Sequence, residues 1–284
     1  HGRPGDRPPL RREVHIHARQ GERPLRGGHA ARRQESPASA PNVIAVGAVS
    51  PTNHRYKVYS RHVNPARGHQ KPEVANYAEF IFPDVTVFTD NEGRTWNGRF
   101  DKTSAAAPYT AGMTAVLFSQ HPFFEWHPEL VKAHFLASEK IPINYAYNHD
   151  LDNESVAKGI PTYSSIAWNH RDGYWDGENN CCFDANNRIS FYENDIQSGV
   201  HYRIAISWLT SPNYLLDYGT LSQDLDLFVY QNGQLLAYSL SGSDPFEVVD
   251  FTTQSDADLE IVIERYANSG DDKVILGYSF WNDF

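Results

Sequence analysis

A hydroxyl pair followed by a run of small residues constrains the fold of this chain more than any other segment. The run reads Lys102-Thr103-Ser104-Ala105-Ala106-Ala107-Pro108-Tyr109-Thr110-Ala111-Gly112. Serine is a preferred N-cap because its side chain accepts from the free N–H groups of a first helical turn. The pattern therefore predicts a helix with Ser104 as its N-cap and Pro108 near the end of its first turn. The small side chains indicate a buried helix with one hydroxyl at its positive end.

The same run resembles the serine motif of the subtilisin-like peptidases, G-T-S-x-A-x-P-x-x-x-G, at every position except the leading glycine, which is Lys102 here. Two further segments precede this run in the chain and occur in the order found in that family. Residues 36–49 are similar to its P-A-x-x-P-x-V-I-x-V-G-A strand, and residues 71–75 are similar to its K-P-D/E-[IV]-x-A segment. Alone, the run would indicate an ordinary serine cap on an alanine-rich core helix. Three segments in order favour the resemblance.

The resemblance implies a serine-type endopeptidase in which Ser104 is the nucleophile of an acyl-enzyme and its own N–H is one oxyanion donor. The serine needs a general base, and the base needs a carboxylate that fixes its tautomer. The family places both upstream of the serine, and residues 36–103 show neither motif. We therefore expect the chain as given to be inactive. The resemblance implies protein or peptide substrates and no cofactor for the chemistry.

Two departures keep a second interpretation open. Lys102 replaces the motif glycine, and Asn76-Tyr77-Ala78 replaces the usual Ala-Pro-Gly. Glycine at such a position usually marks close backbone approach or a positive φ. The alternative is a non-catalytic pseudoprotease, a binding module whose β-sandwich holds a ligand.

The first 35 residues differ in composition from the rest. They hold nine arginines against four acidic residues, with no lysine and no aromatic residue, in a chain of net charge −10. Such a segment lacks the apolar groups that offset ordering entropy, so we expect it to be disordered or poorly packed. A basic arm for nucleic acid, a solvated tail and an off-frame reading of GC-rich DNA remain possible, and we favour the last. His15, His17 and His29 are expected to be solvated rather than to serve as the base.

Periodicity and turn residues divide the remainder into two parts. Residues 36–171 are predicted to be a partial catalytic α/β domain, residues 172–186 a linker, and residues 187–284 a β-sandwich. The α/β part contains buried strands at 43–49 and 85–88 and helices at 104–120 and from residue 127. The fold class is thus the C-terminal half of a subtilisin-like three-layer domain, followed by an all-β, jelly-roll-like sandwich. The predicted strands of the sandwich are 188–193, 202–208, 225–230, 234–239, 246–251, 261–263 and 274–280, with a hairpin turn at Asn232-Gly233.

The second part resembles the β-sandwich appended to many subtilases, through residues 222–230 and Asp244-Pro245-Phe246-Glu247. Asp224 and Asp226 point to the same side of a strand, so structural calcium is conceivable there. A solvated acidic strand end is the favoured interpretation. A second acidic loop, His149-Asp150 with Asp152 and Glu154, is a further candidate for calcium.

The remaining features limit the compartment and the partners. The adjacent Cys181 and Cys182 are expected to be reduced, because a bond between neighbours strains the peptide. Most histidines are expected to be surface or capping residues, namely His62, His69, His121, His127, His134, His149 and His170. The chain shows no signal peptide and no apolar run long enough to span a membrane. The resemblance implies an extracellular location, and we expect a monomer that binds neither nucleic acid nor a membrane.

Overall fold

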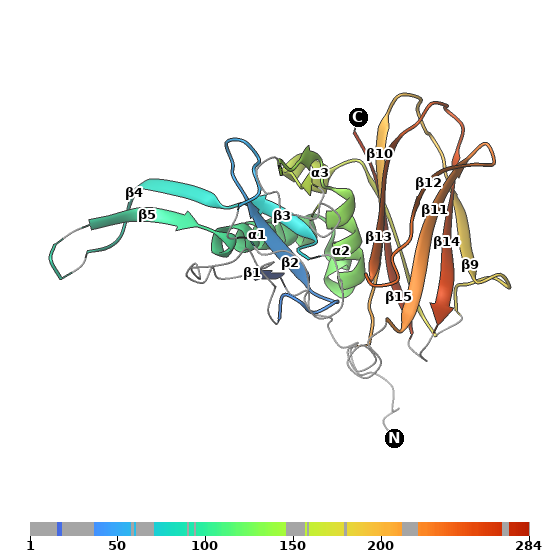
Figure 1. Cartoon of the computed structure of the whole chain (residues 1–284), viewed down its shortest axis with the longest axis horizontal. Helices are drawn as coiled ribbons and strands as arrows, with labels where there is room; N and C mark the ends of the chain where they lie inside the picture. The colour runs from blue at the N-terminus through green and yellow to red at the C-terminus, as the bar shows by residue number, and fades with distance from the viewer. Residues whose placement is uncertain are drawn as a thin grey trace, which may run out of the picture.

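The structure, a computed structural model, describes part of the 284-residue chain. The described residues are 16–18, 37–57, 60, 71–89, 91–93, 95–145, 157, 159–178, 181–211, 221–268 and 273–283. Figure 1 shows an α/β part on one side and two β-sheets on the other, with helix α2 (Pro128–Ala137) between them. None of the described helices is both long and apolar enough to cross a bilayer.

A parallel three-stranded sheet in the order β1-β2-β3 lies at the centre of the α/β part. The three strands are β1 (Ile16–Ala18), β2 (Ile44–Val49) and β3 (Val74–Tyr77). Every residue of β2 is buried, as its unbroken apolar sequence predicts for a parallel strand covered on both faces. Strand β1 pairs with β2 from Ile16 opposite Ile44. Residues 16–18 of the arginine-rich head, which we expected to be disordered or poorly packed, thus form a paired strand, and the rest of the head lies outside the described residues.

Helix α1 (Thr103–Gln120) packs on this sheet through small side chains. Its contact with β2 is a cluster of Val46, Ala48, Ala78, Ala106 and Ala107. Alanine side chains let the helix approach the strands closely, which is the role that the small-residue run predicts. A hairpin of β4 (Glu79–Thr89) and β5 (Thr95–Asp101) extends away from the sheet before the chain enters α1 (Figure 1). The strand predicted at 85–88 is confirmed within β4.

The helical segments after α1 begin at the prolines that mark helix starts in the sequence. A 3-10 turn, η1 (Pro122–Trp126), precedes α2, and both begin at a proline in their first turn. The predicted second helix is confirmed as α2. A two-stranded ribbon of β6 (Ile141–Pro142) and β7 (Gly159–Ile160) and the short helix α3 (Tyr163–Ala167) complete this part.

The second part contains two antiparallel four-stranded sheets, in the orders β13-β10-β15-β8 and β12-β11-β14-β9. All seven predicted strands are present. Their bounds are β9 (Arg188–Glu193), β10 (His201–Trp208), β11 (Gln223–Gln231), β12 (Gln234–Ser239), β13 (Phe246–Thr252), β14 (Leu259–Asn268) and β15 (Val274–Asn282). Asn232 and Gly233 have φ values of 53° and 73°, which is the geometry expected of an Asn-Gly hairpin turn.

An eighth strand, β8 (His170–Gly177), pairs with β15 and overlaps the first part of the segment predicted to be a linker. That prediction is wrong for residues 172–177. Aspartate and glycine suggest a turn in isolation. Pairing with a whole neighbouring strand outweighs that local preference, because it supplies partners for the backbone N–H and C=O groups.

The sandwich is packed firmly against α2. At Gly277 on β15, an added Cβ would lie 2.5 Å from the Leu130 backbone, so only glycine permits this approach. Arg203 on β10 donates 2.8 Å hydrogen bonds to the Leu136 carbonyl and to Glu139. A shared apolar cluster of Leu136, Ala137, Ala205, Phe246 and Trp281 covers the junction. The sheet containing β10 and β15 is thus covered on both faces.

Candidate active site

Ser104 lies at the second residue of α1, two positions after the N-cap position predicted for it. The helix begins at Thr103, and its N-cap is Lys102, which makes no side-chain capping bond. Ser104 is therefore not the N-cap, and that prediction is wrong. Pro108 lies inside the helix rather than in its first turn. Since proline has no N–H, it leaves the Ser104 carbonyl without its usual helical partner.

The backbone at Lys102 explains why the helix starts where it does. Lys102 has φ 67° and ψ −166°, a combination that glycine adopts freely and other residues adopt at a cost. In this conformation the Lys102 carbonyl accepts from the N–H groups of Ala105 and Ala106, at 3.0 and 3.3 Å. The glycine of the motif thus corresponds to a real backbone requirement, which lysine meets here under strain.

The two hydroxyls at the start of α1 differ in environment. Thr103 is buried, and its Oγ1 has no hydrogen-bond partner among the described residues. Ser104 is half-buried. The N–H groups of the first helical turn have no partner within the helix, so the Ser104 N–H is available to an incoming carbonyl oxygen. Ser104 therefore combines a reachable hydroxyl with an adjacent backbone donor.

Asn76, one of the predicted departures, attaches β3 to α1. This fully buried side chain donates through Nδ2 to Thr110 Oγ1 at 3.2 Å and to Met113 Sδ at 3.3 Å. Its Oδ1 accepts from the Tyr77 N–H at 2.9 Å. Asn76 thus fixes the position of the helix that carries Ser104.

Lys71 and Glu73, from the second matched segment, form a buried ion cluster with Lys132 of α2. Lys71 Nζ donates to the Ala40 and Val43 carbonyls at 2.8 and 2.7 Å and to Glu73. Lys132 donates to the same Glu73 oxygen at 2.8 Å. Burial lowers the pKa of Lys71 to about 8, whereas the two ammonium groups overcome the effect of burial and hold the pKa of Glu73 below its usual value. The matched segment that contains Lys71 and Glu73 thus has a structural role, because its buried ion pairs connect it to α2.

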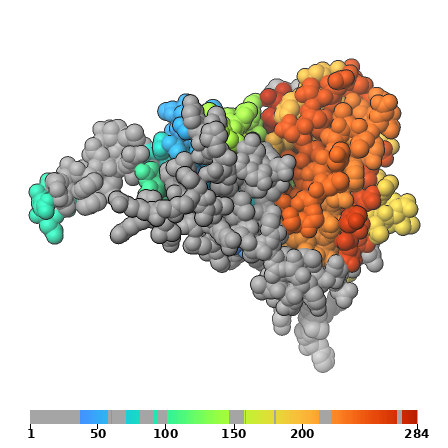
Figure 2. Space-filling view, viewed as in Figure 1, coloured from blue at the N-terminus to red at the C-terminus, as the bar shows by residue number. Residues whose placement is uncertain are grey.

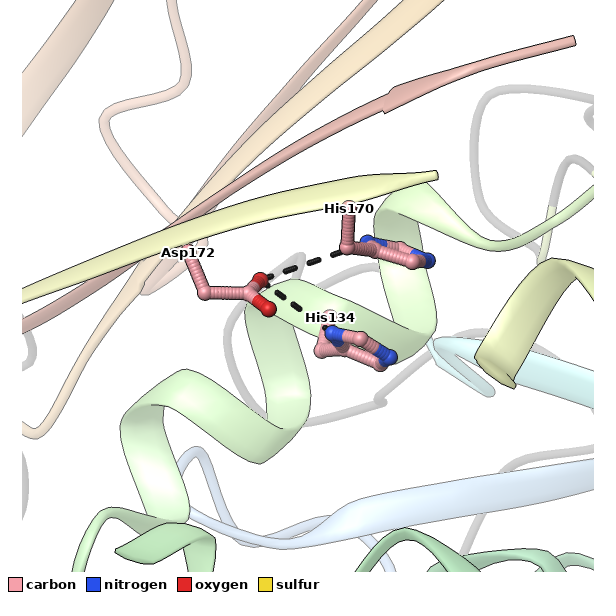
Figure 3. Close-up of side chains that lie close together, drawn as sticks. All are labelled: His134, His170 and Asp172. Atoms are coloured by element: carbon pink, nitrogen blue, oxygen red, sulfur yellow. Dashed lines mark hydrogen bonds and ion pairs between the residues drawn. The ribbon is translucent and has the colours of Figure 1, made fainter. Parts of the chain in front are cut away.

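Three side chains at the junction of α2 and the sandwich bring metal-ligating atoms together (Figure 3). The atoms belong to His134 on α2 and to His170 and Asp172 on β8, and all lie within 4.8 Å of one another. Asp172 Oδ1 is 3.1 Å from His134 Nδ1 and 4.0 Å from His170 Nδ1. The histidine side chains are 2% and 5% exposed, so the prediction that they are surface or capping residues is wrong.

The geometry of this cluster fits a charged pair better than a metal. The two imidazole rings stack at 3.7 Å with 25° between their planes, so their in-plane lone pairs do not converge on one point. His134 Nε2 lies 2.9 Å from the Ile166 carbonyl, and His134 Nδ1 faces the Asp172 carboxylate. Both ring nitrogens of His134 therefore face hydrogen-bond acceptors.

His170 stays neutral beside His134. Its Nε2 lies 2.5 Å from the Ser165 carbonyl, while Nδ1 lies 2.8 Å from Ser279 Oγ, which can donate to it. Burial, and then the neighbouring His134, lower the pKa of His170 to about 3. Asp172 is held ionised because the two histidines outweigh its burial and lower its pKa. In the sequence, only the spacing His170-x-Asp172, which places both side chains on one side of a strand, could have indicated this cluster. The contact of His134 with it arises only in the folded structure.

The predicted calcium ligands lie elsewhere. Asp224 and Asp226 are on β11, where Asp226 pairs in register with Glu264. Burial, then Asp224 and Glu264, raise the pKa of Asp226 to about 6. Within the described residues, neither aspartate belongs to a group of three ligands with metal-binding spacing. The acidic loop at 149–154 lies outside the described residues.

A cavity of about 410 Å³ lies at the edge of the same junction, lined in part by Glu139, Arg203, Asp244 and Glu247. Glu247 Oε2 accepts from Ser239, whereas its buried Oε1 has no partner among the described residues. Burial raises the pKa of Glu247 to about 8.

The other predicted residues are placed as follows. Cys181 and Cys182 form a disulfide, so the expectation of a reduced pair is wrong. His121 is exposed, and His127 contacts Glu129 at 3.0 Å just before α2. His15, His29, His62, His69 and His149 lie outside the described residues, and His17 is described only as part of β1.

Comparison with known proteins identifies relatives of the first part. The sequence model of the subtilase family matches residues 22–174, a range that begins inside the arginine-rich head. Subtilisin NAT from Bacillus subtilis subsp. natto is 33% identical over 86 residues, which are 30% of this chain and 19% of that protein.

Solved structures are similar over longer segments. The prenylagaramide maturation protease PagA is 27% identical with a TM-score of 0.32, over 46% of this chain and 43% of that chain. Fervidolysin from Fervidobacterium pennivorans, a keratinolytic enzyme related to subtilisin, is 13% identical with a TM-score of 0.32, over 76% of this chain and 28% of that chain. The chain thus spans less than half the length of each of these relatives.

Proposed function

Because this chain belongs to the subtilase family, we propose that Ser104 is the nucleophile of a subtilisin-like serine endopeptidase. The observation that carries this proposal is the position of Ser104, half-buried at the second residue of α1 in the register of the family's serine motif. In the proposed reaction its Oγ attacks a peptide carbonyl, the amine leaves, and water later hydrolyses the acyl-enzyme.

The surrounding backbone supports this role. The Ser104 N–H has no helical acceptor and donates to the oxyanion that forms during attack. No described residue hydrogen-bonds to Ser104 Oγ in the way that a general base would. The resemblance places the base and its carboxylate upstream of the serine, so we assign them to segments N-terminal to residue 36. Asn76 and the Lys71–Glu73–Lys132 cluster hold the helix and sheet that position the nucleophile.

The experiment that tests this proposal is active-site labelling of the protein expressed from its complete reading frame. A fluorophosphonate probe is expected to label Ser104 and to leave Ser104→Ala unlabelled. Thr103 and Thr110 are internal controls, because both are buried and neither is expected to react. A protein that folds cooperatively but stays unlabelled at Ser104 would refute the peptidase assignment.

That outcome would favour the second candidate, a pseudoprotease that serves as a binding module. The strained Lys102 at the position of the motif glycine is the observation in its favour. Labelling therefore separates the two functions directly.

The remaining assignments complete the proposal. We take residues 36–171 as the partial catalytic domain and residues 187–284 as the jelly-roll-like sandwich, in a secreted monomer that acts on proteins or peptides. Structural calcium at Asp224 and Asp226 is the alternative to a solvated acidic strand end, and it requires that calcium raise the melting temperature of the protein but not that of an Asp226→Asn variant. An equal rise in both proteins would place any bound calcium elsewhere.

A further inference from the structure

The outer sheet of the sandwich, β12-β11-β14-β9, carries an apolar surface where an open antiparallel face is usually polar. Its inner side chains, such as Leu227, Ile261 and Ile263, belong to the core. The alternating residues therefore point outward. The opposite sheet is the one that α2 covers, so this face is turned away from the α/β part, on the right of Figures 1 and 2.

Strand register arranges the outward side chains in three rows, which we call the outer face. The first row runs Tyr192, Glu260, Tyr230, Leu235, and the second runs Ser190, Val262, Phe228, Tyr238. The third row contains Arg188, Glu264 and Asp226. Neighbouring members of a row lie about 5 Å apart, so the apolar side chains of β14, β11 and β12 in the first two rows form one patch, in which Val262 is buried. Tyr192 on β9 lies on the other side of Glu260 from Tyr230.

The rings of this patch are exposed. Tyr192 is 63% exposed, Tyr238 is 60% exposed and Leu235 is 49% exposed, with Phe228 and Tyr230 half-buried between them. Single exposed apolar residues are normal on protein surfaces, whereas contiguous apolar patches mark binding sites. Aromatic rings are enriched in such sites because they bury a large area with little loss of side-chain freedom.

The charges on the outer face indicate the chemistry of the partner. It carries the half-buried carboxylates of Glu260 and Glu264 and that of Asp226, which is only 9% exposed, against the single cation Arg188. That cation is already occupied, because Arg188 contacts Glu264 at 2.7 Å. The face therefore has an excess of negative charge.

From this arrangement we infer that the outer face binds an extended polypeptide segment that carries lysine or arginine side chains. Cations of such a segment pair with Glu260 and with Glu264, and they also interact favourably with the faces of tyrosine rings. Glu260 and Glu264 are four residues apart on β14, a separation of about 13 Å in a strand. A partner that runs along β14 meets both carboxylates with cations spaced four residues apart and places the side chains between them on the apolar rows.

Two other occupants fit the face less well. A neutral polysaccharide would stack on the rings but would leave the carboxylates desolvated without a counter-charge. A second copy of this chain would bring together two like-charged surfaces, since the chain has a net charge of −10. This inference concerns a surface apart from Ser104, so its test does not depend on peptidase activity.

The test uses a synthetic peptide, acetyl-Lys-Val-Tyr-Val-Lys-amide, titrated into the protein by calorimetry. Binding is expected at low salt and is expected to weaken at least fivefold between 0.05 and 0.5 M NaCl. A Tyr192→Ser/Tyr238→Ser double variant is expected to bind at least tenfold more weakly, and so is Glu260→Lys. The matched control is Tyr163→Ser on α3, a tyrosine 49% exposed outside the outer face, which is expected to bind like the parent.

A second peptide, acetyl-Glu-Val-Tyr-Val-Glu-amide, is expected not to bind the parent protein. Equal binding of both peptides, or full binding by the double variant, would overturn the inference. Binding of xylohexaose or cellohexaose with no binding of the lysine peptide would also overturn it, in favour of a glycan. A dimer that dissociates in the double variant would overturn it in favour of self-association.

Discussion

The side-chain amide of Asn76 on β3 donates a hydrogen bond of 3.2 Å to the hydroxyl of Thr110 on α1. The two residues are 34 positions apart, and the bond joins the sheet to the helix that carries Ser104. In sequence, Asn76 stands where the resemblance leads one to expect a different residue. In the structure, it is a buried polar group whose donor and acceptor atoms are both used.

Asn76→Ala is therefore expected to destabilise the protein. The change removes the bonds to Thr110 and to the Tyr77 N–H and leaves a small cavity, at a cost of about 2 kcal/mol. Urea unfolding measures this loss as a shift of the midpoint. Gln254→Ala, at an exposed position, is the control and is expected to leave the midpoint unchanged. Equal midpoints for both variants would show that Asn76 does not secure α1.

Lys102→Gly is expected to stabilise the protein. The backbone at residue 102 has φ 67° and ψ −166°, which costs a non-glycine residue about 1–3 kcal/mol. Glycine removes that strain, but its greater freedom in the unfolded state lowers the free energy of unfolding by about 0.5–1 kcal/mol. A net gain of about 1 kcal/mol in the free energy of unfolding remains. Asn232→Gly is the control, because asparagine tolerates the left-handed conformation of a hairpin turn and little gain is expected there. A lower melting temperature for Lys102→Gly would show that the lysine side chain contributes more than its backbone costs.

Glu247 is expected to make stability decrease as the pH rises. Burial raises its pKa from the usual 4.5 to about 8, so the folded protein keeps a proton that the unfolded chain has lost between these values. The contribution is fully present below pH 4.5 and is lost as the pH rises through 8. The Ser239 hydroxyl and the Ser241 backbone donate to it, and the charges of Asp244 and Asp226 add to the effect of burial.

Replacing Glu247 with glutamine tests this pH dependence. The variant keeps the shape but cannot ionise, so at pH 8.5 it is expected to be more stable than the parent by an amount of the order of 2 kcal/mol. At pH 4.5 the two proteins are expected to be alike. Chemical denaturation at both pH values measures the difference, with Glu178→Gln, at an exposed position, as the control. If the difference in unfolding free energy between the parent and Glu247→Gln is the same at pH 5 and pH 8.5, the raised pKa of Glu247 is contradicted.

Asp172→Asn is expected to weaken the attachment of the sandwich to α2. The change removes the carboxylate that contacts His134 Nδ1 at 3.1 Å, at a junction where both side chains are largely buried. We expect a loss of about 2 kcal/mol at pH 7. In the parent this contribution is present above the unfolded carboxyl pKa near 3.8 and is lost as the pH falls through the lower folded value.

The matched control for this change is Asp176→Asn, an exposed aspartate on the same strand. Thermal unfolding followed from pH 3 to pH 8 is the measurement. An Asp172→Asn variant as stable as Asp176→Asn at pH 7 would mean that the histidine pair needs no carboxylate. A large increase in stability on adding zinc to the parent would favour the metal interpretation instead.

Local patterns in the sequence determined most of the elements. The continuous apolar run of β2, the proline before α2 and the period-two alternation of the seven sandwich strands are signals carried by neighbouring residues. For the same reason the position of Ser104 in the first turn of a small-residue helix was predictable to within two residues. Residue identity also fixed the hairpin at Asn232-Gly233, because few other pairs accept two positive φ values.

The tertiary structure alone decided which distant residues meet. Strand β8 was missed because its aspartates and glycines suggest a turn until β15 supplies its hydrogen-bond partners. The contact of Glu73 with Lys132 and that of His134 with Asp172 join segments 59 and 38 residues apart, for which the sequence gives no periodic signal. The charge state of a buried histidine or carboxylate depends on the groups that surround it in space. Such properties arise only when folding removes water and brings those groups together.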